Sequence, residues 1–207
     1  GWIRFCDHYF PDLLPNVSTC KSPQQMTGAM IKTWFAEKNG LDPKNIVVVS
    51  VMPCIAKKAE RELPGMQSAG AGSDVDLVLT TRDRARIVRA EHIDVEQLAD
   101  SPFDDPLGNG SGAGVIFGAT GGVMEAALRS AYFLTTGENP SADAFCEVRA
   151  AENESRPWRE AAFDLAGTTI HCAVASGLAN ARHLIRAIKR REVHYEFVEI
   201  MACPGGC

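Results

Sequence analysis

Short apolar runs alternate along the chain with amphipathic stretches, an arrangement typical of α/β proteins. Runs rich in β-branched residues predict strands, and stretches whose apolar positions recur at helical spacing predict helices. The predicted strands are residues 46–51, 75–80, 145–150, 168–175 and 195–200, and the predicted helices are residues 22–39, 82–90, 123–133 and 177–191. Two prolines and four glycines between Asp100 and Gly114 predict a long surface loop.

The first predicted helix has clear start and stop signals. Ser22 is a good N-cap, the proline after it suits a first turn, and Gln25 completes a capping box. Asn39-Gly40 is a natural stop. The apolar positions predicted to form the buried stripe of this helix are Met26, Ala29, Met30 and Trp34.

Composition narrows the function classes. The 207 residues are 45% hydrophobic and 23% charged, with a net charge of −5. These values are ordinary for a globular protein and unfavourable for binding nucleic acid or an anionic membrane. No stretch approaches the ~20 uninterrupted apolar residues that a membrane-spanning helix requires. Because the chain starts at Gly1 and stops at Cys207 in a tight turn, we expect it to be an excerpt, truncated at both ends.

The seven cysteines do not suggest a disulfide scaffold, because such scaffolds are smaller, denser in cysteine and usually even in count. Four of the seven stand alone in apolar or mixed surroundings, where a small buried side chain is the expected role. These four are Cys6, Cys20, Cys146 and Cys172.

The remaining three cysteines follow two related segments. Residues 49–54 and 198–203 share the pattern V-x-(V/I)-M-x-C, so two predicted strands each lead into a methionine and then a cysteine. Ligands of open α/β sheets bind beyond the carboxyl ends of the strands. If the two strands are neighbours, Cys54 and Cys203 meet at one crevice.

Cys203 and Cys207 enclose the sequence Pro-Gly-Gly, which lets the backbone turn sharply and approach a large object closely. Structural zinc sites usually have two-residue spacing and a second ligand pair, which is missing here. An iron–sulfur cluster, a redox dithiol and a structural turn all remain open for this motif. Lys57, three residues after Cys54, has the position of a donor to an anionic ligand, although composition alone favours a solvated lysine.

Four segments together resemble the catalytic domain of iron-only hydrogenases. They are Ser-Thr-Cys-Lys-Ser-Pro-Gln-Gln at 18–25, Met-Pro-Cys-Ile-Ala-Lys-Lys at 52–58, Phe-Gly-Ala-Thr-Gly-Gly-Val-Met-Glu-Ala-Ala at 117–127 and Met-Ala-Cys-Pro-Gly-Gly-Cys at 201–207. They occur in the family's order and the resemblance runs from end to end, with Gly1-Trp2 similar to the tail of the family's first cysteine motif.

The resemblance implies an α/β fold of two lobes, each a largely parallel sheet flanked by helices, with the active site in the cleft between them. Residues 1–207 would be the central part of one catalytic domain, with the loop at 100–114 as a candidate lobe boundary. The implied activity is the reversible reduction of protons to H2 with electrons from a ferredoxin-like carrier. The implied cofactor is the H-cluster, a 4Fe–4S cubane bridged to a diiron unit that carries CO, CN and dithiolate ligands.

The resemblance also implies residue roles. Cys54, Cys203 and Cys207 match cubane ligands, and Cys207 matches the thiolate that bridges to the diiron unit. The fourth ligand and a proton-relay cysteine are expected upstream of Gly1, so residues 1–207 alone are expected to be inactive. The other matches are a cyanide-binding lysine at Lys57, a second cyanide contact at Pro23 and Gln24, a proton-route hydroxyl at Ser18, and apolar packing residues at Met52, Phe117 and Met201.

Three alternatives to a metabolic hydrogenase stay open. They are a non-catalytic iron–sulfur assembly relative of the same fold, a sensory hydrogenase-like protein, and an α/β protein that uses Cys203 and Cys207 as a redox dithiol. The resemblance implies maturation proteins as partners, because CO and CN are not protein groups. Free thiols suit the cytoplasm, while periplasmic export is also known in the family.

Overall fold

The computed structural model describes residues 1–150 and 156–206. The chain divides into two compact units, each described below by itself: unit 1 comprises Gly1–Asn16 and Gly110–Cys207, and unit 2 comprises Val17–Asn109. Helices and two small sheets make up the units, so the predicted α/β class is confirmed. The sheet of unit 1 is mixed and not largely parallel as predicted, because β3 and β4 are joined by a short antiparallel turn. Within the described residues, every helix is too short or too polar to cross a membrane.

Unit 1 contains a three-stranded sheet in the order β3-β4-β5. Strand β4 pairs antiparallel with β3 and parallel with β5, with Ser176 opposite Met201 at the end of the parallel pair. The elements of unit 1 are α1 (Trp2–Tyr9), the 3-10 helix η1 (Pro11–Asn16), α6 (Gly112–Ile116), α7 (Gly122–Thr136), α8 (Glu147–Ala150), β3 (Arg159–Leu165), β4 (Thr168–Ser176), α9 (Leu178–Lys189) and β5 (Phe197–Met201).

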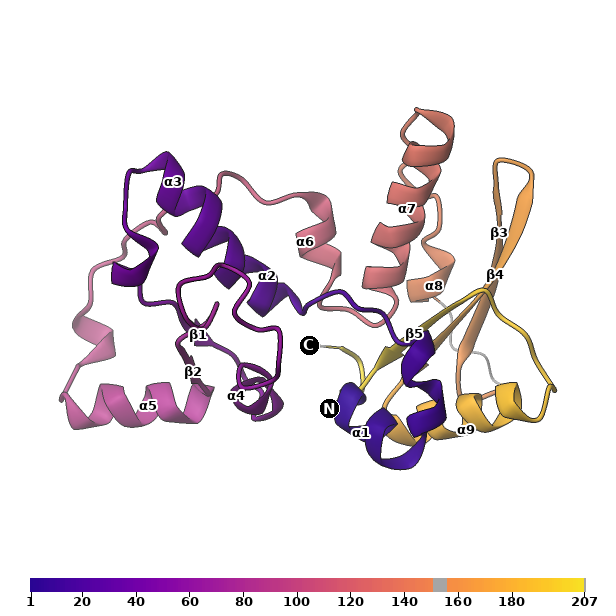
Figure 1. The fold of residues 1–207 in the computed structure, drawn as a ribbon, viewed down its shortest axis with the longest axis horizontal. Helices are drawn as coiled ribbons and strands as arrows, with labels where there is room; N and C mark the ends of the chain where they lie inside the picture. The colour runs from indigo at the N-terminus through magenta and orange to yellow at the C-terminus, as the bar shows by residue number, and fades with distance from the viewer. Residues whose placement is uncertain (151–155, 207) are drawn as a thin grey trace. The chain divides into compact units, whose positions relative to one another are not determined.

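Both faces of strand β4 are covered, as Figure 1 shows for helix α9 on one side of the sheet and α7 with α8 on the other. Cys172 and Val174 pack against Met124 and Leu128 of α7. The alternate residues of β4 pack on the other face against α9, where Leu184 is fully buried. This alternation follows from the two-residue period of a strand, and it explains the nearly continuous apolar sequence of β4.

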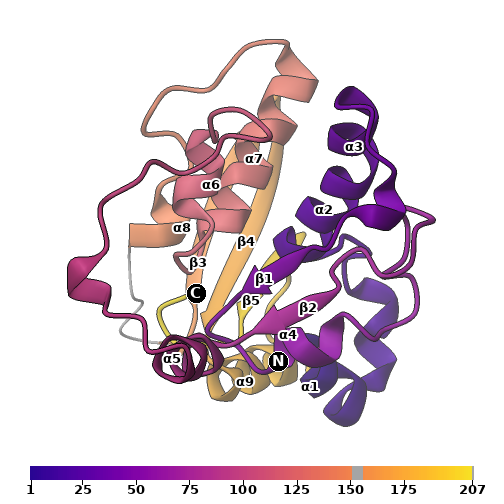
Figure 2. The ribbon, with the colours of Figure 1, turned by 90° about the vertical axis from the view of Figure 1, so that its left-hand side faces the viewer.

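Unit 2 is built around two short parallel strands, which lie side by side in Figure 2. Ser50 of β1 stands opposite Val78 of β2. The elements are α2 (Pro23–Met30), the π-helix η2 (Ile31–Phe35), α3 (Ala36–Lys38), the 3-10 helix η3 (Pro43–Asn45), β1 (Val49–Val51), α4 (Ala56–Glu60), β2 (Leu77–Leu79), α5 (Thr81–Ala90) and the 3-10 helix η4 (Val95–Gln97).

The predicted start of the helix at 22–39 is confirmed, but its predicted buried stripe is wrong. Met26, Met30 and Trp34 are more than 40% exposed, and the helix instead buries Gln25, Gly28, Lys32 and Ala36. Gly28 lies against the backbone of Asp74, where a Cβ atom would come within 2.4 Å of the carbonyl oxygen. Lys32 reaches Asp76 at 2.7 Å, so an ion pair and a backbone contact determine the buried face.

The strand predicted at 145–150 is also wrong, because this segment forms a turn followed by the short helix α8. Phe145 and Val148 are both buried, Phe145 from the turn, where its φ angle is 67°, and Val148 from α8. The strand β3 was not predicted, since the two alanines at its centre have low strand propensity. Its side chains nevertheless alternate in burial, and Ala161, Phe163 and Leu165 pack on the core.

A buried aspartate fixes the loop that follows α4 in unit 2. Asp74 is fully buried and accepts hydrogen bonds from Lys21 Nζ at 2.8 Å, Ser68 Oγ at 2.8 Å and the Ala69 N–H at 2.9 Å. Burial raises the pKa of this carboxyl, but the hydrogen bonds from Lys21, Ala69 and Ser68 outweigh it and lower the pKa to about 2. The folded state therefore stabilises the ionised carboxylate of Asp74 relative to the protonated form.

We expect Asp74→Asn to destabilise the complete protein by about 2 kcal/mol at neutral pH. The folded-state pKa lies below the unfolded value, so this contribution is complete above pH ~4 and is lost as pH falls through the folded value. Urea unfolding from pH 7 to pH 2 tests the prediction. The wild type should lose its advantage in unfolding free energy over Asp74→Asn as the pH falls. The control variant Asp94→Asn, changed at an exposed N-cap, should show the same change of unfolding free energy with pH as the wild type. An unchanged slope for Asp74→Asn would contradict the prediction.

Candidate iron–sulfur site

The first cysteine segment leaves the end of strand β1. The Met52 N–H donates to the Leu79 carbonyl at 2.9 Å, and the Cys54 N–H donates to the Met52 carbonyl at 2.8 Å. Pro53 has no N–H to extend the strand pairing. The chain therefore turns tightly at Cys54, whose free thiol is half-buried.

Lys57 lies in helix α4, which begins two residues after Cys54. Its Nζ forms an ion pair with Glu60 Oε2 at 2.8 Å, and its side chain is 22% exposed. Its predicted role toward a cyanide ligand is not tested and stays a prediction. The neighbouring Lys58 pairs instead with Asp83 of α5, so the two lysines point to different partners.

The segment at 18–25 leads into helix α2 through a loop that is held by a local hydrogen bond. Ser18 Oγ accepts from the Cys20 N–H at 3.2 Å, and both residues are exposed, so the predicted burial of Cys20 is wrong. Ser22 Oγ accepts from the Gln25 N–H at 3.4 Å, which confirms the predicted N-cap. The reciprocal half of the capping box is absent, because the Gln25 side chain makes no hydrogen bond in the described residues.

The start of α2 is connected to strand β1 through Gln24. Its Oε1 accepts from Ser50 Oγ at 2.7 Å, while Gln24 Nε2 is buried without a partner among the described residues. Pro23, the preceding residue, is exposed. A buried amide without a partner loses its hydrogen bonds to water without replacement, so a polar ligand at this helix start would stabilise the arrangement.

The second cysteine segment follows strand β5 in unit 1 and forms the cysteine turn, residues 203–206. The Gly206 N–H donates to the Cys203 carbonyl at 3.1 Å and closes the turn. The thiol of Cys203 is free and the residue is exposed. Gly205 and Gly206 both have positive φ angles, of 80° and 110°, which glycine adopts without steric strain.

The cysteine turn lies on the GATGG loop, residues 118–122. Ala119 and Gly206 form an antiparallel bridge, and the Thr120 N–H donates to the Gly205 carbonyl at 3.4 Å. A Cβ on Gly206 would stand 2.0 Å from the Gly118 carbonyl oxygen, so only glycine permits this approach. Phe117 ends helix α6 just before the loop and is half-buried, as is Met201 at the end of β5.

The structure leaves the predicted convergence of three cysteines untested. Strand β1 pairs with β2 and strand β5 pairs with β4, so the two strands before Cys54 and Cys203 are not neighbours in one sheet. Cys54 belongs to unit 2 and Cys203 to unit 1, while Cys207 lies outside the described residues. Across residues 1–150 and 156–206 no three His, Cys, Asp or Glu side chains gather as a metal site, and the described part includes only two of the three candidate thiols.

Sequence reasoning missed two residues beside the cysteine turn, Ser176 and Glu199. Ser176 Oγ accepts from the Gly205 N–H at 2.8 Å. Glu199 is nine-tenths buried and accepts from the Gly121 N–H at 2.6 Å and the Met124 N–H at 2.8 Å. A carboxylate inside the predicted strand at 195–200 was the available signal for Glu199. No sequence pattern indicated Ser176.

The donor set of these segments fits an iron–sulfur cofactor with polar ligands. Free thiols at Cys54 and Cys203 are the ligand type that iron–sulfur clusters take. The unpartnered amide nitrogen of Gln24 is a donor for a polar ligand, and glycines let the cysteine turn approach a bulky group. The chemistry of the residues thus agrees with the motifs.

Comparison with protein families gives one match that covers residues 1–207, the iron only hydrogenase large subunit, C-terminal domain. The NADP-reducing hydrogenase subunit HndD of Solidesulfovibrio fructosivorans is 46% identical over this whole chain, which spans 34% of that protein. The periplasmic Fe hydrogenase large subunit of Nitratidesulfovibrio vulgaris is 43% identical over the whole chain and 48% of its own length. The cytosolic iron-sulfur assembly component 3 of Pongo abelii is 32% identical, with 44% of its length covered.

Solved structures give the same answer. The apo FeFe-hydrogenase HydA1 of Chlamydomonas reinhardtii, in a point variant, matches all of this chain and 58% of its own with a TM-score of 0.78 and 37% identity. A structure of FeFe-hydrogenase inactivated by oxygen at the 2Fe subcluster of its H cluster matches with a TM-score of 0.78 and 38% identity, over 57% of its chain. The chain thus spans between a third and three-fifths of these relatives. It belongs to the iron-only hydrogenase large-subunit family and corresponds over its whole length to the family's C-terminal domain.

Proposed function

We propose that this chain forms part of the H-cluster site of an iron-only hydrogenase. The enzyme combines two protons and two electrons into H2, and runs the reaction in reverse, with a ferredoxin-like carrier as the electron partner. The observation that carries the proposal is the cysteine turn packed on the GATGG loop, because two motifs of the family are joined there by backbone hydrogen bonds. The family membership of the whole chain supports it.

In this proposal Cys54, Cys203 and Cys207 would hold the cubane as thiolates, and Cys207 would also hold the diiron unit. When bound, the diiron unit supplies the metal centre at which protons and H2 interconvert. A cubane takes four thiolates, and these are three of them. We therefore propose that residues 1–207 expressed alone evolve no hydrogen.

The polar residues of the site compensate the charge of anionic ligands. Lys57 would donate a charge-assisted hydrogen bond to one cyanide after its ion pair with Glu60 opens, and the segment at Pro23 and Gln24 would hold the other cyanide. Such donors are needed because an uncompensated charge in a low-dielectric site is unfavourable. Ser18 is exposed and accepts a hydrogen bond from the Cys20 N–H. In this proposal its hydroxyl holds and passes a proton.

Three apolar side chains exclude water from the diiron unit in this proposal: Met52, Phe117 and Met201. Each is half-buried in the structure and is the first residue of one of the family's segments. Thioether and aromatic groups offer a soft, polarisable surface without competing hydrogen bonds. Exclusion of water also tunes the reduction potential of a cluster.

A non-catalytic role in iron–sulfur assembly is the second candidate, and the 32% identity to an iron-sulfur assembly component favours it as the alternative. The hydrogenases match with higher identity, 46% and 43%. The two candidates differ in chemistry, because an assembly protein without a diiron unit has no CO or CN ligands. A sensory hydrogenase-like protein would retain those ligands and differ in turnover.

The experiment is anaerobic production of the complete protein that carries this sequence, with and without hydrogenase maturation proteins. With them, we expect infrared bands of CO and CN ligands and hydrogen evolution from reduced ferredoxin. Without them, both should be missing while cubane absorbance remains. A cubane with neither diatomic bands nor hydrogen after maturation would refute the hydrogenase proposal and favour the assembly role, whereas bands with very slow turnover would favour a sensor.

A further inference from the structure

We infer that Ser176 and Glu199 are positioning residues that hold the cysteine turn in its ligand-binding conformation. The inference rests on the proposed function, since it assigns the two residues to the cluster that Cys203 and Cys207 would bind. Neither residue is a cysteine or belongs to the four motifs. Both lie in the described part of unit 1, and both reach the turn or the loop beneath it by hydrogen bonds.

Ser176 holds the turn directly. It is the last residue of β4, opposite Met201 of β5, and the Gly177 N–H donates to the Met201 carbonyl at 2.8 Å. The Ser176 hydroxyl accepts from the Gly205 N–H at 2.8 Å and lies 3.5 Å from Thr120 Oγ1. One hydroxyl thus contacts both the cysteine turn and the GATGG loop.

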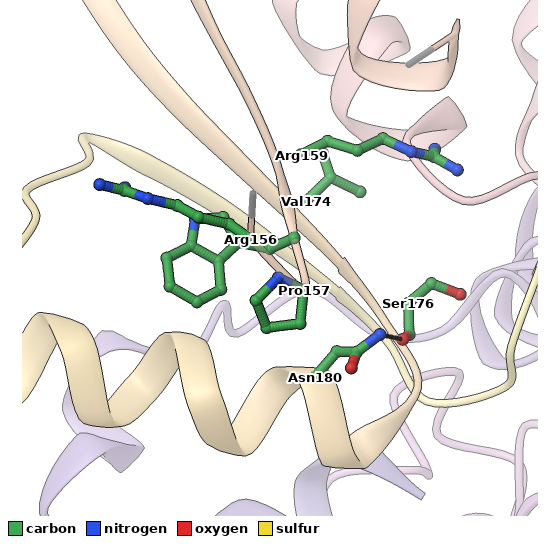
Figure 3. Close-up of a pocket in the computed structure, with 7 residues that line it drawn as sticks. Arg156, Pro157, Arg159, Val174, Ser176 and Asn180 are labelled. Atoms are coloured by element: carbon green, nitrogen blue, oxygen red, sulfur yellow. Dashed lines mark hydrogen bonds between the residues drawn. The ribbon is translucent and has the colours of Figure 1, made fainter. Parts of the chain in front are cut away.

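A second hydrogen bond, from Asn180, holds the backbone of Ser176. Figure 3 shows its side chain directed away from Asn180, which is joined to Ser176 by a dashed line. That bond runs from Asn180 Nδ2 to the Ser176 carbonyl at 2.9 Å, so it leaves the hydroxyl available for the turn. A small pocket of about 180 Å³ lies here, lined by both residues together with Arg159 and Val174.

Glu199 holds the loop beneath the turn. Within β5 it stands on the face toward α7, a position that the neighbouring strand fills with Val174. Helix α7 begins after Gly121, which has no side chain to serve as a cap, and Glu199 accepts instead from the N–H groups of Gly121 and Met124. Burial raises the pKa of the Glu199 carboxyl, while these two hydrogen bonds oppose the shift. A carboxylate at a helix N-terminus also interacts favourably with the helix dipole.

The GATGG loop and the cysteine turn are joined by hydrogen bonds, so a shift of one displaces the other. The bridge between Ala119 and Gly206 and the bond from the Thr120 N–H to the Gly205 carbonyl join them. Glu199 therefore acts on the turn through the loop, and Ser176 acts on it directly. Arg159 adds a third restraint by donating to the Thr120 carbonyl at 3.1 Å.

Positioning of this kind has a specific consequence for a bound cluster. The reduction potential of an iron–sulfur cluster depends on the hydrogen bonds to its sulfur atoms and on its exposure to solvent. If the cysteine turn loses one of its restraints, the hydrogen bonds to the Cys203 sulfur and the solvent exposure of Cys203 both change. Ser176→Ala removes the acceptor for the Gly205 N–H. Glu199→Gln replaces one of the two accepting oxygens with an amide NH2 group, which cannot accept from the N–H groups at the start of α7.

The test is an EPR-monitored redox titration of the complete protein loaded with the cubane alone, without maturation proteins. At the wild-type midpoint potential, we expect Ser176→Ala and Glu199→Gln to change the ratio of reduced to oxidised cubane at least threefold. Ser176→Thr, which keeps the hydroxyl, should restore the wild-type ratio. If Glu199→Gln fails to fold, Ser176→Ala decides alone.

A matched control lies on helix α7. Among the described residues, Ser130 Oγ donates only to the Ala126 carbonyl of its own helix. Ser130→Ala should lower the melting temperature but leave the ratio unchanged. A ratio at the wild-type value in Ser176→Ala would overturn the inference, as would an equal shift in the control. A wild-type protein without a cubane signal would instead overturn the proposed function on which the inference rests.

Discussion

Replacing Gly206 with alanine is expected to abolish cluster binding in the complete protein. The added methyl group would stand 2.0 Å from the Gly118 carbonyl oxygen and 3.0 Å from the Ala119 Cα atom. Both neighbours are backbone, so neither can rotate away as a side chain could. The φ angle of 110° is unfavourable for alanine as well, at a cost of ~1–3 kcal/mol. The turn must therefore separate from the loop, and we expect iron content and hydrogen evolution below a tenth of the wild type.

Gly167 provides the control for this substitution. It lies in the turn between β3 and β4 with a φ angle of 87°, and a Cβ there would meet nothing within 4 Å. Gly167→Ala thus carries the backbone strain without the collision, and it should keep cluster and activity. Iron analysis and gas chromatography on both variants make the comparison. Equal iron content in Gly206→Ala and Gly167→Ala would show that the close contact is unimportant.

Replacing either Cys54 or Cys203 with serine is expected to cause a comparable loss. Each substitution exchanges a thiolate for a hydroxyl, which iron in a cubane binds poorly. Cys207→Ala should have an effect of its own: it removes the thiolate proposed to hold the diiron unit, so hydrogen evolution should vanish even if part of the cubane is retained. Iron and sulfide analysis, together with the hydrogen assay, distinguishes these outcomes.

Two other cysteines serve as controls for the chemistry of sulfur loss. Cys20 is exposed and Cys146 is half-buried, and neither matches a ligand position. Cys20→Ser and Cys146→Ser should keep at least half of the wild-type iron and activity. If Cys54→Ser and Cys203→Ser behaved like these controls, the residue assignments of the site would be wrong.

Much of the local structure could be predicted because its signals are local. The cap at Ser22, the α/β alternation and the strand that ends at Met201 all follow from short-range patterns. The buried face of the first helix could not be predicted from apolar positions, because it depends on partners distant in sequence. Lys32 is buried through its ion pair with Asp76, and Gly28 through its contact with the Asp74 backbone. Hydrophobicity alone assigns both to the wrong side.

The candidate site shows the same division. Cys54, Cys203 and Lys57 were named from motifs, and the structure locates each at the end of a strand or the start of a helix. Ser176 and Glu199 act through the register of β4 and β5 and through the start of α7, a relation that appears only when the three elements are assembled. Hydrogen bonds between distant segments have no pattern in the sequence.

The central claim is that the thiolates of Cys54, Cys203 and Cys207 bind one cluster. The most direct measurement is a crystal structure of the complete, anaerobically loaded protein, with iron located by anomalous diffraction. The account predicts a single cubane bonded to all three sulfur atoms, with a second iron group attached at Cys207. Iron bonded elsewhere, or the three sulfur atoms on separate centres, would contradict it.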